Sequence, residues 1–250
     1  VAGKPQVIFT RRVSDLETPV SAMLKLQTEP GPSFLLESVE GGETRGRYSI
    51  IGLNPDMMWR CFGNRSEIST VPPFAEESFA PSWDDSMSAL RDLVRTHRME
   101  LPEGTPPMAA GLIGYMGYDM VRLMERLPEA KADPIAIPDA CFIRPRAQLI
   151  FDAVDGVVYI IAPIWDMKGD ADEVYDDAVR RIERLAGTLQ GPLDQRNYYK
   201  DVPATPRTFT SNVTLEEYGA MVSRAQDYIA AGDIFQVVLR QRFEAAFELP

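Results

Sequence analysis

Apolar residues that recur every three or four positions predict helices in four parts of the chain. These helices are expected at 18–27, from Ser82 onward, at 170–189 and from Thr214 onward. Their start signals agree with the spacing, because Thr18 precedes a proline at the first helical position and Thr214 forms a capping box with Glu217. Gly232 is placed to end the last helix.

Shorter apolar runs bounded by glycine and polar residues predict strands. They lie at 33–38, 47–53, 57–62, 65–70, 147–165 and 234–243. The clearest is 147–165, a hairpin with Asp155-Gly156 at a turn where φ must be positive. The glycine-containing segment 108–125 predicts a strand or tight turn that opens into a helix near Tyr118.

The order of these elements favours an α+β fold, with largely antiparallel sheets and flanking helices. Strands and helices do not alternate regularly, and the strands are joined as hairpins, which argues against a doubly wound parallel sheet. Residues 1–190 are expected to form one module, 191–212 a polar linker, and 213–250 the start of a second unit. The chain is thus expected to hold one whole module and part of another.

Composition narrows the class of protein. With 26 basic and 37 acidic residues, the formal charge of −11 disfavours nucleic acid as a partner, although a pocket can still be locally positive. The two cysteines have no paired spacing, which excludes a zinc finger and argues against a disulfide scaffold. No signal peptide and no apolar run of about 20 residues is evident, so no membrane is expected and the cytoplasm is the expected location.

Chemistry visible in the residues alone is sparse. No phosphate-binding loop, nucleophile elbow or zinc-protease motif occurs, and His97, the one histidine, reads as a helix-end residue. Glu37 and Ser38 follow an apolar strand and either hold an amino-acid ammonium or simply mark where the strand meets water. Gln236 lies within a predicted strand, where an unpartnered buried amide would cost about 1–3 kcal/mol, so it either has a hydrogen-bond partner or faces a wet cavity.

Three segments together resemble component I of anthranilate synthase, the large chorismate-binding subunit. They are "FLLESVEGGETRGRYSIIGLNP" (34–55), "GLIGYMGYDMVRLMERLP" (111–128) and "AGDIFQVVLRQRF" (231–243). They occur in the family's order and spacing over nearly the whole chain. The first two match the family's regulatory module, and the third matches the opening of its chorismate-using domain.

The resemblance implies roles for particular residues. Leu36, Glu37 and Ser38 match the segment that contributes to a feedback site for tryptophan, and Arg47 or Tyr48 falls near a basic residue of that site. Gln236 would form part of the active-site wall, where water-adding relatives carry a lysine that can act as a general base. A neutral amide there suits an enzyme that adds ammonia, which needs no such base.

The implied reaction converts chorismate and ammonia to anthranilate and pyruvate, with feedback inhibition by tryptophan. A glutamine amidotransferase subunit would supply the ammonia, and Mg²⁺ would be held by ligands expected beyond residue 250, with none assigned within this chain. We therefore expect the chain to be part of a longer protein and to be inactive alone. Two alternatives are aminodeoxychorismate synthase component I, whose matching strand reads closer to "YQVNL", and a stand-alone amino-acid-binding regulatory module.

Overall fold

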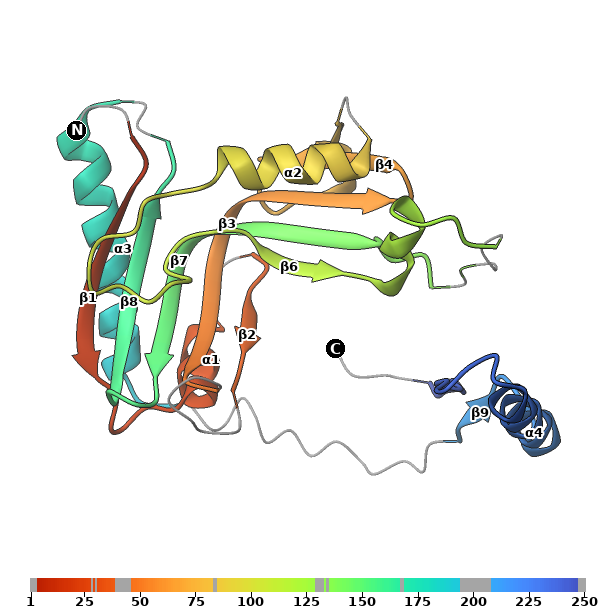
Figure 1. The fold of residues 1–250 in the computed structure, drawn as a ribbon. Helices are drawn as coiled ribbons and strands as arrows, with labels where there is room; N and C mark the ends of the chain where they lie inside the picture. Colours follow the sequence, from red (N-terminus) through yellow and green to blue (C-terminus); the bar gives the residue numbers. More distant parts are fainter. Residues whose placement is uncertain are drawn as a thin grey trace. The chain divides into compact units, whose positions relative to one another are not determined.

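The structure is a computed structural model that divides into two compact units, Val1–Asp194 and Gln195–Pro250 (Figure 1). It describes residues 4–27, 29, 31–38, 46–82, 85–128, 133, 135–166, 169–193 and 208–246. Most of the predicted linker 191–212 and the loop 39–45 lie outside the described residues. The expected boundaries at 190 and 213, and the roles given to the modules, stay predictions.

The first unit is built on antiparallel strands with helices packed against them. Its strands are β1 (Gln6–Val13), β2 (Phe34–Leu36), β3 (Tyr48–Phe62), β4 (Arg65–Ser69), β5 (Ala80–Pro81), β6 (Ile113–Met116), β7 (Ala140–Asp152) and β8 (Val157–Ile164). Its helices are α1 (Pro19–Leu26), α2 (Ser86–Thr96) and α3 (Ala171–Gln190), with 3-10 turns at Glu76–Ser78 and Tyr118–Leu123. Every strand pairing described is antiparallel, which confirms the predicted α+β class.

The long strands β3 and β7 pair with each other and hold the sheet together (Figure 1). Each takes different outer neighbours along its length: β3 pairs with β2 and then β4, and β7 pairs with β6 and then β8. Between these halves the β3–β7 register shifts between Pro55 and Met57, and Asn54 has a positive φ of 50°. A bulge of this kind bends a strand, and β3 turns sharply there. The predicted strands 47–53 and 57–62 are therefore one bent strand.

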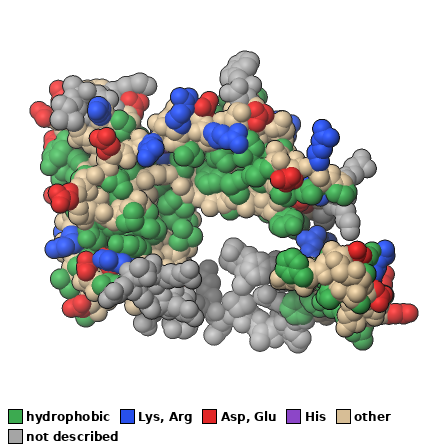
Figure 2. Space-filling model, in the orientation of Figure 1, with side chains coloured by type: hydrophobic (Ala, Val, Ile, Leu, Met, Phe, Trp, Pro, Cys, Tyr) green, Lys and Arg blue, Asp and Glu red, His purple; other side chains and the backbone are tan. Residues whose placement is uncertain are grey.

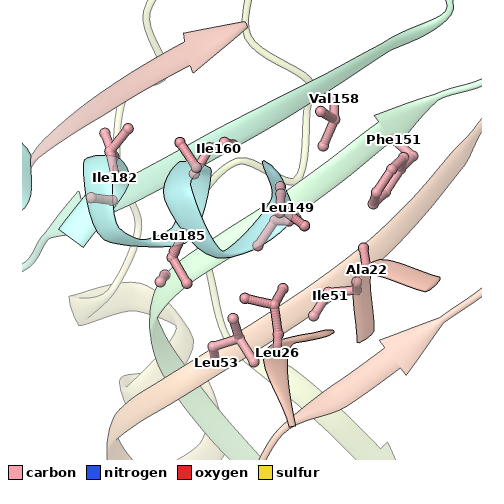
Figure 3. Close-up of a cluster of buried hydrophobic side chains, with 14 of the residues drawn as sticks. Ala22, Leu26, Ile51, Leu53, Leu149, Phe151, Val158, Ile160, Ile182 and Leu185 are labelled. Atoms are coloured by element: carbon pink, nitrogen blue, oxygen red, sulfur yellow. The ribbon is translucent and has the colours of Figure 1, made fainter. Parts of the chain in front are cut away.

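The largest core lies between helices α1 and α3 and one face of strands β3, β7 and β8 (Figure 3). Leu26 of α1 and Leu185 of α3 are buried against Ile51, Leu149 and Ile160 of three adjacent strands. The helices form here because their apolar residues fall on one face and their caps are in place. Thr18 accepts the Ser21 N–H, as the sequence predicted for the first helix.

The predicted hairpin is present, whereas the second helix begins later than predicted. The 147–165 hairpin is confirmed as β7 and β8, with Gly156 at φ 62° in its turn. Helix α2 begins later than Ser82, because the carboxylate of Asp85 accepts the N–H groups of Met87 and Ser88 and so caps the helix there.

Strand β6 lies unusually close to β7, because Gly114 carries no side chain beyond hydrogen. A Cβ on Gly114 would lie 1.9 Å from the carbonyl oxygen of Cys141. After β6 the chain enters the 3-10 turn at Tyr118, as predicted for this segment. Figure 2 shows hydrophobic side chains over β6 and its neighbours, and Tyr115 and Met116 of this strand are exposed.

We expect Gly114→Ala to lower the free energy of unfolding by about 3 kcal/mol, because the new methyl group would push β6 off β7. Gly187→Ala is the matched control. Gly187 lies in α3, and a methyl group there would meet nothing within 4 Å, so alanine should stabilise by about 0.5–1 kcal/mol through helix propensity. Urea unfolding followed by circular dichroism measures both. Equal effects of the two substitutions would contradict the close packing of β6.

The second unit contains α4 (Leu215–Ala231) and the short strands β9 (Thr210–Ser211) and β10 (Phe243–Glu244). The predicted capping box is confirmed: Glu217 N–H donates to Thr214 Oγ1, and the Glu217 carboxylate accepts the Thr214 N–H. Gly232 ends the helix in the left-handed conformation, with φ 81°.

The predicted strand 234–243 is wrong. Only Phe243 at its end is in a strand, and there it pairs with Ser211. The apolar residues do alternate, but the backbone groups of a strand need a partner strand. The described part of this unit supplies only the two residues of β9 as a partner. Phe235 and Val238 are 94% and 82% exposed, so the pattern marks a surface rather than a packed strand.

Candidate functional site

The clearest candidate site lies where β2 ends beside the start of β3. In the β2–β3 register Leu36 faces Ile50, so two residues further on Ser38 lies opposite Tyr48. The Ser38 N–H donates to the Ser49 Oγ at 3.0 Å, and the Ser38 Oγ donates to the Tyr48 carbonyl oxygen at 2.8 Å. Side-chain hydroxyls therefore continue the contact between the two strands after the backbone ladder stops.

Arg47 binds the far end of the β7–β8 hairpin. Its guanidinium donates to both carboxylate oxygens of Asp152, at 2.8 and 2.6 Å, and reaches Asp155 at 3.3 Å. The Asp152 side chain is only 1% exposed and also accepts the N–H groups of Val154 and Asp155. Burial raises the pKa of Asp152, but these hydrogen bonds outweigh it and the net pKa is lowered. Arg47 thus fixes the start of β3.

Tyr48 lies between the two features. The Arg47 guanidinium lies 5.1 Å from the centroid of its ring, and Tyr48 packs against the buried cluster that includes Ile50 and Ile150. Burial is the main cause of the raised pKa of its phenol. Tyr48 faces Asp152 in the β3–β7 register, and its carbonyl oxygen accepts the Ser38 hydroxyl from the other side of β3.

The structure brings together most of the residues predicted for this site. Ser38 contacts Tyr48 directly, and Arg47 immediately precedes Tyr48 in the chain. Leu36 is 51% exposed. It lies opposite Ile50 of β3, and the two side chains are on the same face of the sheet. Glu37 follows the last residue of β2 and is exposed.

Two contributors were missed from the sequence. Ser49 and Asp152 are buried polar residues within apolar strands, at 7% and 2% exposure. A polar residue inside such a strand is the signal that could have identified them, since burial without a partner is unfavourable. The partner of Asp152 is Arg47, which the β3–β7 pairing brings close from a distant part of the chain, and the partner of Ser49 is Ser38, which the β2–β3 pairing brings close.

Gln236 belongs to the second unit, where its side chain is exposed and outside any strand. The neighbouring Gln241 instead donates to Ser211 Oγ at 2.8 Å. Neither the buried amide with a structural partner nor the regular strand face expected for Gln236 is present in the described unit. Its role in an active-site wall stays a prediction.

Other groups of charged residues are paired within the fold. A pocket of about 320 Å³ lies where β8 ends and α3 begins. Of its lining residues, Asp177 contacts Arg146 at 3.1 Å and Arg181 at 3.2 Å, and Asp56 pairs with Arg144 at 2.7 Å. Across the described residues, no three His, Cys, Asp or Glu side chains are grouped so that they could hold a metal ion. These features identify no ligand.

His97 has a structural role at the end of α2. Its Nδ1 lies 2.7 Å from the Leu93 carbonyl oxygen, and burial lowers the pKa of its imidazole. The helix-end interpretation of this residue is confirmed. In the part of the chain that the structure describes, no helix combines the length and apolar character needed to cross a bilayer.

A model of one protein family matches residues 31–250, and its description is "chorismate binding enzyme". This match spans most of the chain, including the β2–β3 site and the second unit. The chain therefore belongs to the family of chorismate binding enzymes.

Individual relatives identify a narrower group within this family. The chain is 43% identical to anthranilate synthase component 1 of Cereibacter sphaeroides, in an alignment covering 100% of this chain and 50% of the relative. It is 36% identical to the protein of that name from Mycobacterium tuberculosis, over 98% of this chain and 48% of the relative. The resemblance to anthranilate synthase component I is confirmed, and the chain spans about half the length of these curated relatives.

A solved structure shows the same fold. The crystal structure of anthranilate synthase component I from Streptococcus pneumoniae TIGR4 matches with a TM-score of 0.63 and 23% identity. The match covers 96% of this chain and 49% of that one. This likeness supports the arrangement of the strands and helices.

Proposed function

We propose that this chain is part of the large subunit of an anthranilate synthase, which converts chorismate and ammonia to anthranilate and pyruvate. The observation that carries the proposal is the 43% identity along the whole chain to a relative named anthranilate synthase component 1. The match to the chorismate binding family over 31–250 supports the substrate. The relatives reported above share that name, so aminodeoxychorismate synthase is not favoured.

The β2–β3 site is proposed to bind tryptophan as a feedback inhibitor. The hydroxyl hydrogen of Ser38 is already donated to the Tyr48 carbonyl, so its oxygen faces a ligand as an acceptor. An acceptor suits the ammonium group of an amino acid rather than its carboxylate. Exposed Glu37, the preceding residue in the chain, adds a negative charge that also favours a cation.

Arg47 has a different part in this proposal. Because its guanidinium is bonded to both oxygens of Asp152, it holds the start of β3 in place rather than reaching for a carboxylate. Tyr48 supplies a carbonyl to Ser38 and a ring to the nearby apolar cluster. Tryptophan binding would favour a less active arrangement of the enzyme, a coupling between two sites.

The remaining parts of the proposal concern the whole protein. A glutamine amidotransferase subunit would supply ammonia, and the enzyme would work in the cytoplasm. Bound Mg²⁺ would contribute Lewis-acid chemistry at the substrate. Its ligands are expected beyond residue 250, and no residue of this chain is assigned to the ion.

The proposal is tested with the full-length protein, chorismate, ammonia and Mg²⁺. Anthranilate is strongly fluorescent, so its formation can be followed continuously. We expect fluorescence to rise with ammonia and to fall when tryptophan is added. A protein that consumes chorismate without forming anthranilate would contradict the proposed reaction, and an active protein that ignores tryptophan would contradict the proposed feedback.

Gln236→Lys in the full-length enzyme tests the proposed active-site wall. A lysine there can act as a general base on water, so we expect a minor hydroxylated product beside anthranilate. Gln241→Lys is the matched control, because Gln241 lies in the same segment and bonds to Ser211. Chromatography of the products separates the outcomes. If Gln236→Lys yields only the aminated product, Gln236 does not face the reacting water.

A further inference from the structure

We propose that Ser49 is a positioning residue of the tryptophan site, which holds Ser38 in the orientation that receives the ligand. This inference rests on the proposed function of the β2–β3 site. Sequence resemblance points to Leu36, Glu37 and Ser38, but it gives no role to Ser49. The assignment comes from the contacts of the described strands.

Strand β2 is short and needs an external restraint at its end. Its ladder with β3 covers three residue pairs and stops at Leu36. Glu37 and Ser38 follow outside the ladder and are exposed. Backbone groups beyond the last ladder pair open easily unless another group holds them.

Ser49 supplies that restraint from a rigid position. It is 7% exposed and lies within the 15 residues of β3, facing Phe151 of β7 in the register. Its Oγ accepts the Ser38 N–H at 3.0 Å. The adjacent Ile50 is paired with both β2 and β7, which holds Ser49 in place. The hydrogen bond from the Ser38 N–H then keeps Ser38 beside β3.

The second bond of Ser38 depends on the first. The Ser38 Oγ reaches the Tyr48 carbonyl at 2.8 Å only when the Ser38 backbone is kept beside β3. That bond leaves the Ser38 oxygen as an acceptor for an ammonium group. Loss of the Ser49 hydroxyl would therefore loosen Ser38 without removing any group that contacts the ligand.

The experiment measures tryptophan inhibition of the full-length enzyme, with Ser49→Ala, Ser49→Thr and Ser69→Ala compared with the unchanged protein. Ser69 is the matched control: it is buried on β4 and its Oγ also accepts a backbone N–H, from Val71 at 3.2 Å. We expect Ser49→Ala to raise the tryptophan concentration for half-inhibition about five- to tenfold, as for loss of one hydrogen bond. The kcat and the KM for chorismate should not change.

Ser49→Thr keeps the hydroxyl and should restore inhibition to within about twofold of the unchanged enzyme, since the hydrogen bond is retained. Ser69→Ala should leave inhibition unchanged. Melting temperatures of all variants show whether each is folded at the assay temperature. If Ser49→Ala does not fold, then weakened inhibition by folded Ser49→Cys, whose thiol is a poorer acceptor, supports the proposal and unchanged inhibition overturns it.

Different results would overturn the positioning role of Ser49 and the tryptophan site itself. If Ser38 substitution weakens inhibition but Ser49→Ala does not, the positioning role is overturned and the site remains. If neither substitution changes inhibition, the site itself is overturned. If Ser49→Ala and Ser69→Ala weaken inhibition equally, the effect is general destabilisation and the positioning role is overturned.

Discussion

Ser38→Phe in the full-length enzyme is expected to raise the tryptophan concentration for half-inhibition about a hundredfold, with anthranilate formation retained. The substitution removes the hydroxyl that bonds to the Tyr48 carbonyl and fills the space beside it with a ring. Loss of a polar contact together with a steric clash in one small site supports an effect of this size. The rate of anthranilate formation at increasing tryptophan concentrations gives the inhibition curve.

Ser33→Phe is the control for this experiment. Ser33 is exposed just before β2, so a ring there adds similar bulk near the site without touching its contacts. We expect its inhibition curve to match that of the unchanged enzyme. Superimposable curves for Ser38→Phe and the unchanged enzyme would remove Ser38 from the site.

Asp152→Ala is expected to lower the free energy of unfolding by about 3 kcal/mol at neutral pH, because it removes a buried acceptor that serves Arg47 and two backbone N–H groups. Asp92→Ala is the control. Asp92 contacts Arg95 in an exposed pair on α2, so its loss should change stability by at most about 0.5 kcal/mol. Urea unfolding of each variant measures the difference.

The effect of Asp152→Ala should also depend on pH. The pKa of Asp152 is lowered in the folded state, so its ionised form stabilises the fold fully above its unfolded pKa of about 3.9. That stabilisation is lost as the pH falls through the lower, folded pKa. The difference between the unchanged protein and Asp152→Ala should therefore be constant near neutrality and shrink in acid. A difference that is the same at acidic and neutral pH would contradict an ionised Asp152 in the fold.

The helices of the first unit could be predicted because their signals are local. Thr18 and Asp85 cap helices through hydrogen bonds within three residues, and Gly156 supplies a positive φ to a turn between adjacent strands. Asp85 was nevertheless overlooked in favour of Ser82, and α2 begins after Asp85. Caps decide helix starts more closely than apolar spacing does.

The bend of β3 and the failed strand 234–243 have non-local causes. The bulge after Asn54 depends on the pairing of β3 with β7, and no short sequence pattern predicts it. For 234–243 the alternation of apolar residues was correct, but pairing partners are needed before such a segment becomes a strand. Phe235 is exposed, so the alternation of apolar residues does not by itself show that the segment is a strand packed against another element.

The candidate site was located by resemblance and explained by register. The residues alone gave Ser38 an ambiguous role at a strand end, and the resemblance placed the basic residue of the site only near Arg47 or Tyr48. The pairing of β3 with β2 and β7 shows that Arg47 is engaged by Asp152 and that Ser49 supports Ser38. Arg47 and Asp152 lie far apart in the chain, and Ser38 meets Ser49 only through the β2–β3 pairing, so spacing along the sequence could not supply either contact.

The measurement that tests the central claim most directly is the identity of the product that the full-length protein makes from chorismate and ¹⁵N-ammonia in the presence of Mg²⁺. We predict anthranilate whose ¹⁵N-labelled amino group is bonded to the ring carbon ortho to the carboxylate, together with one pyruvate for each anthranilate. A product with the labelled amino group para to the carboxylate, or pyruvate without any labelled aromatic amine, would contradict the account.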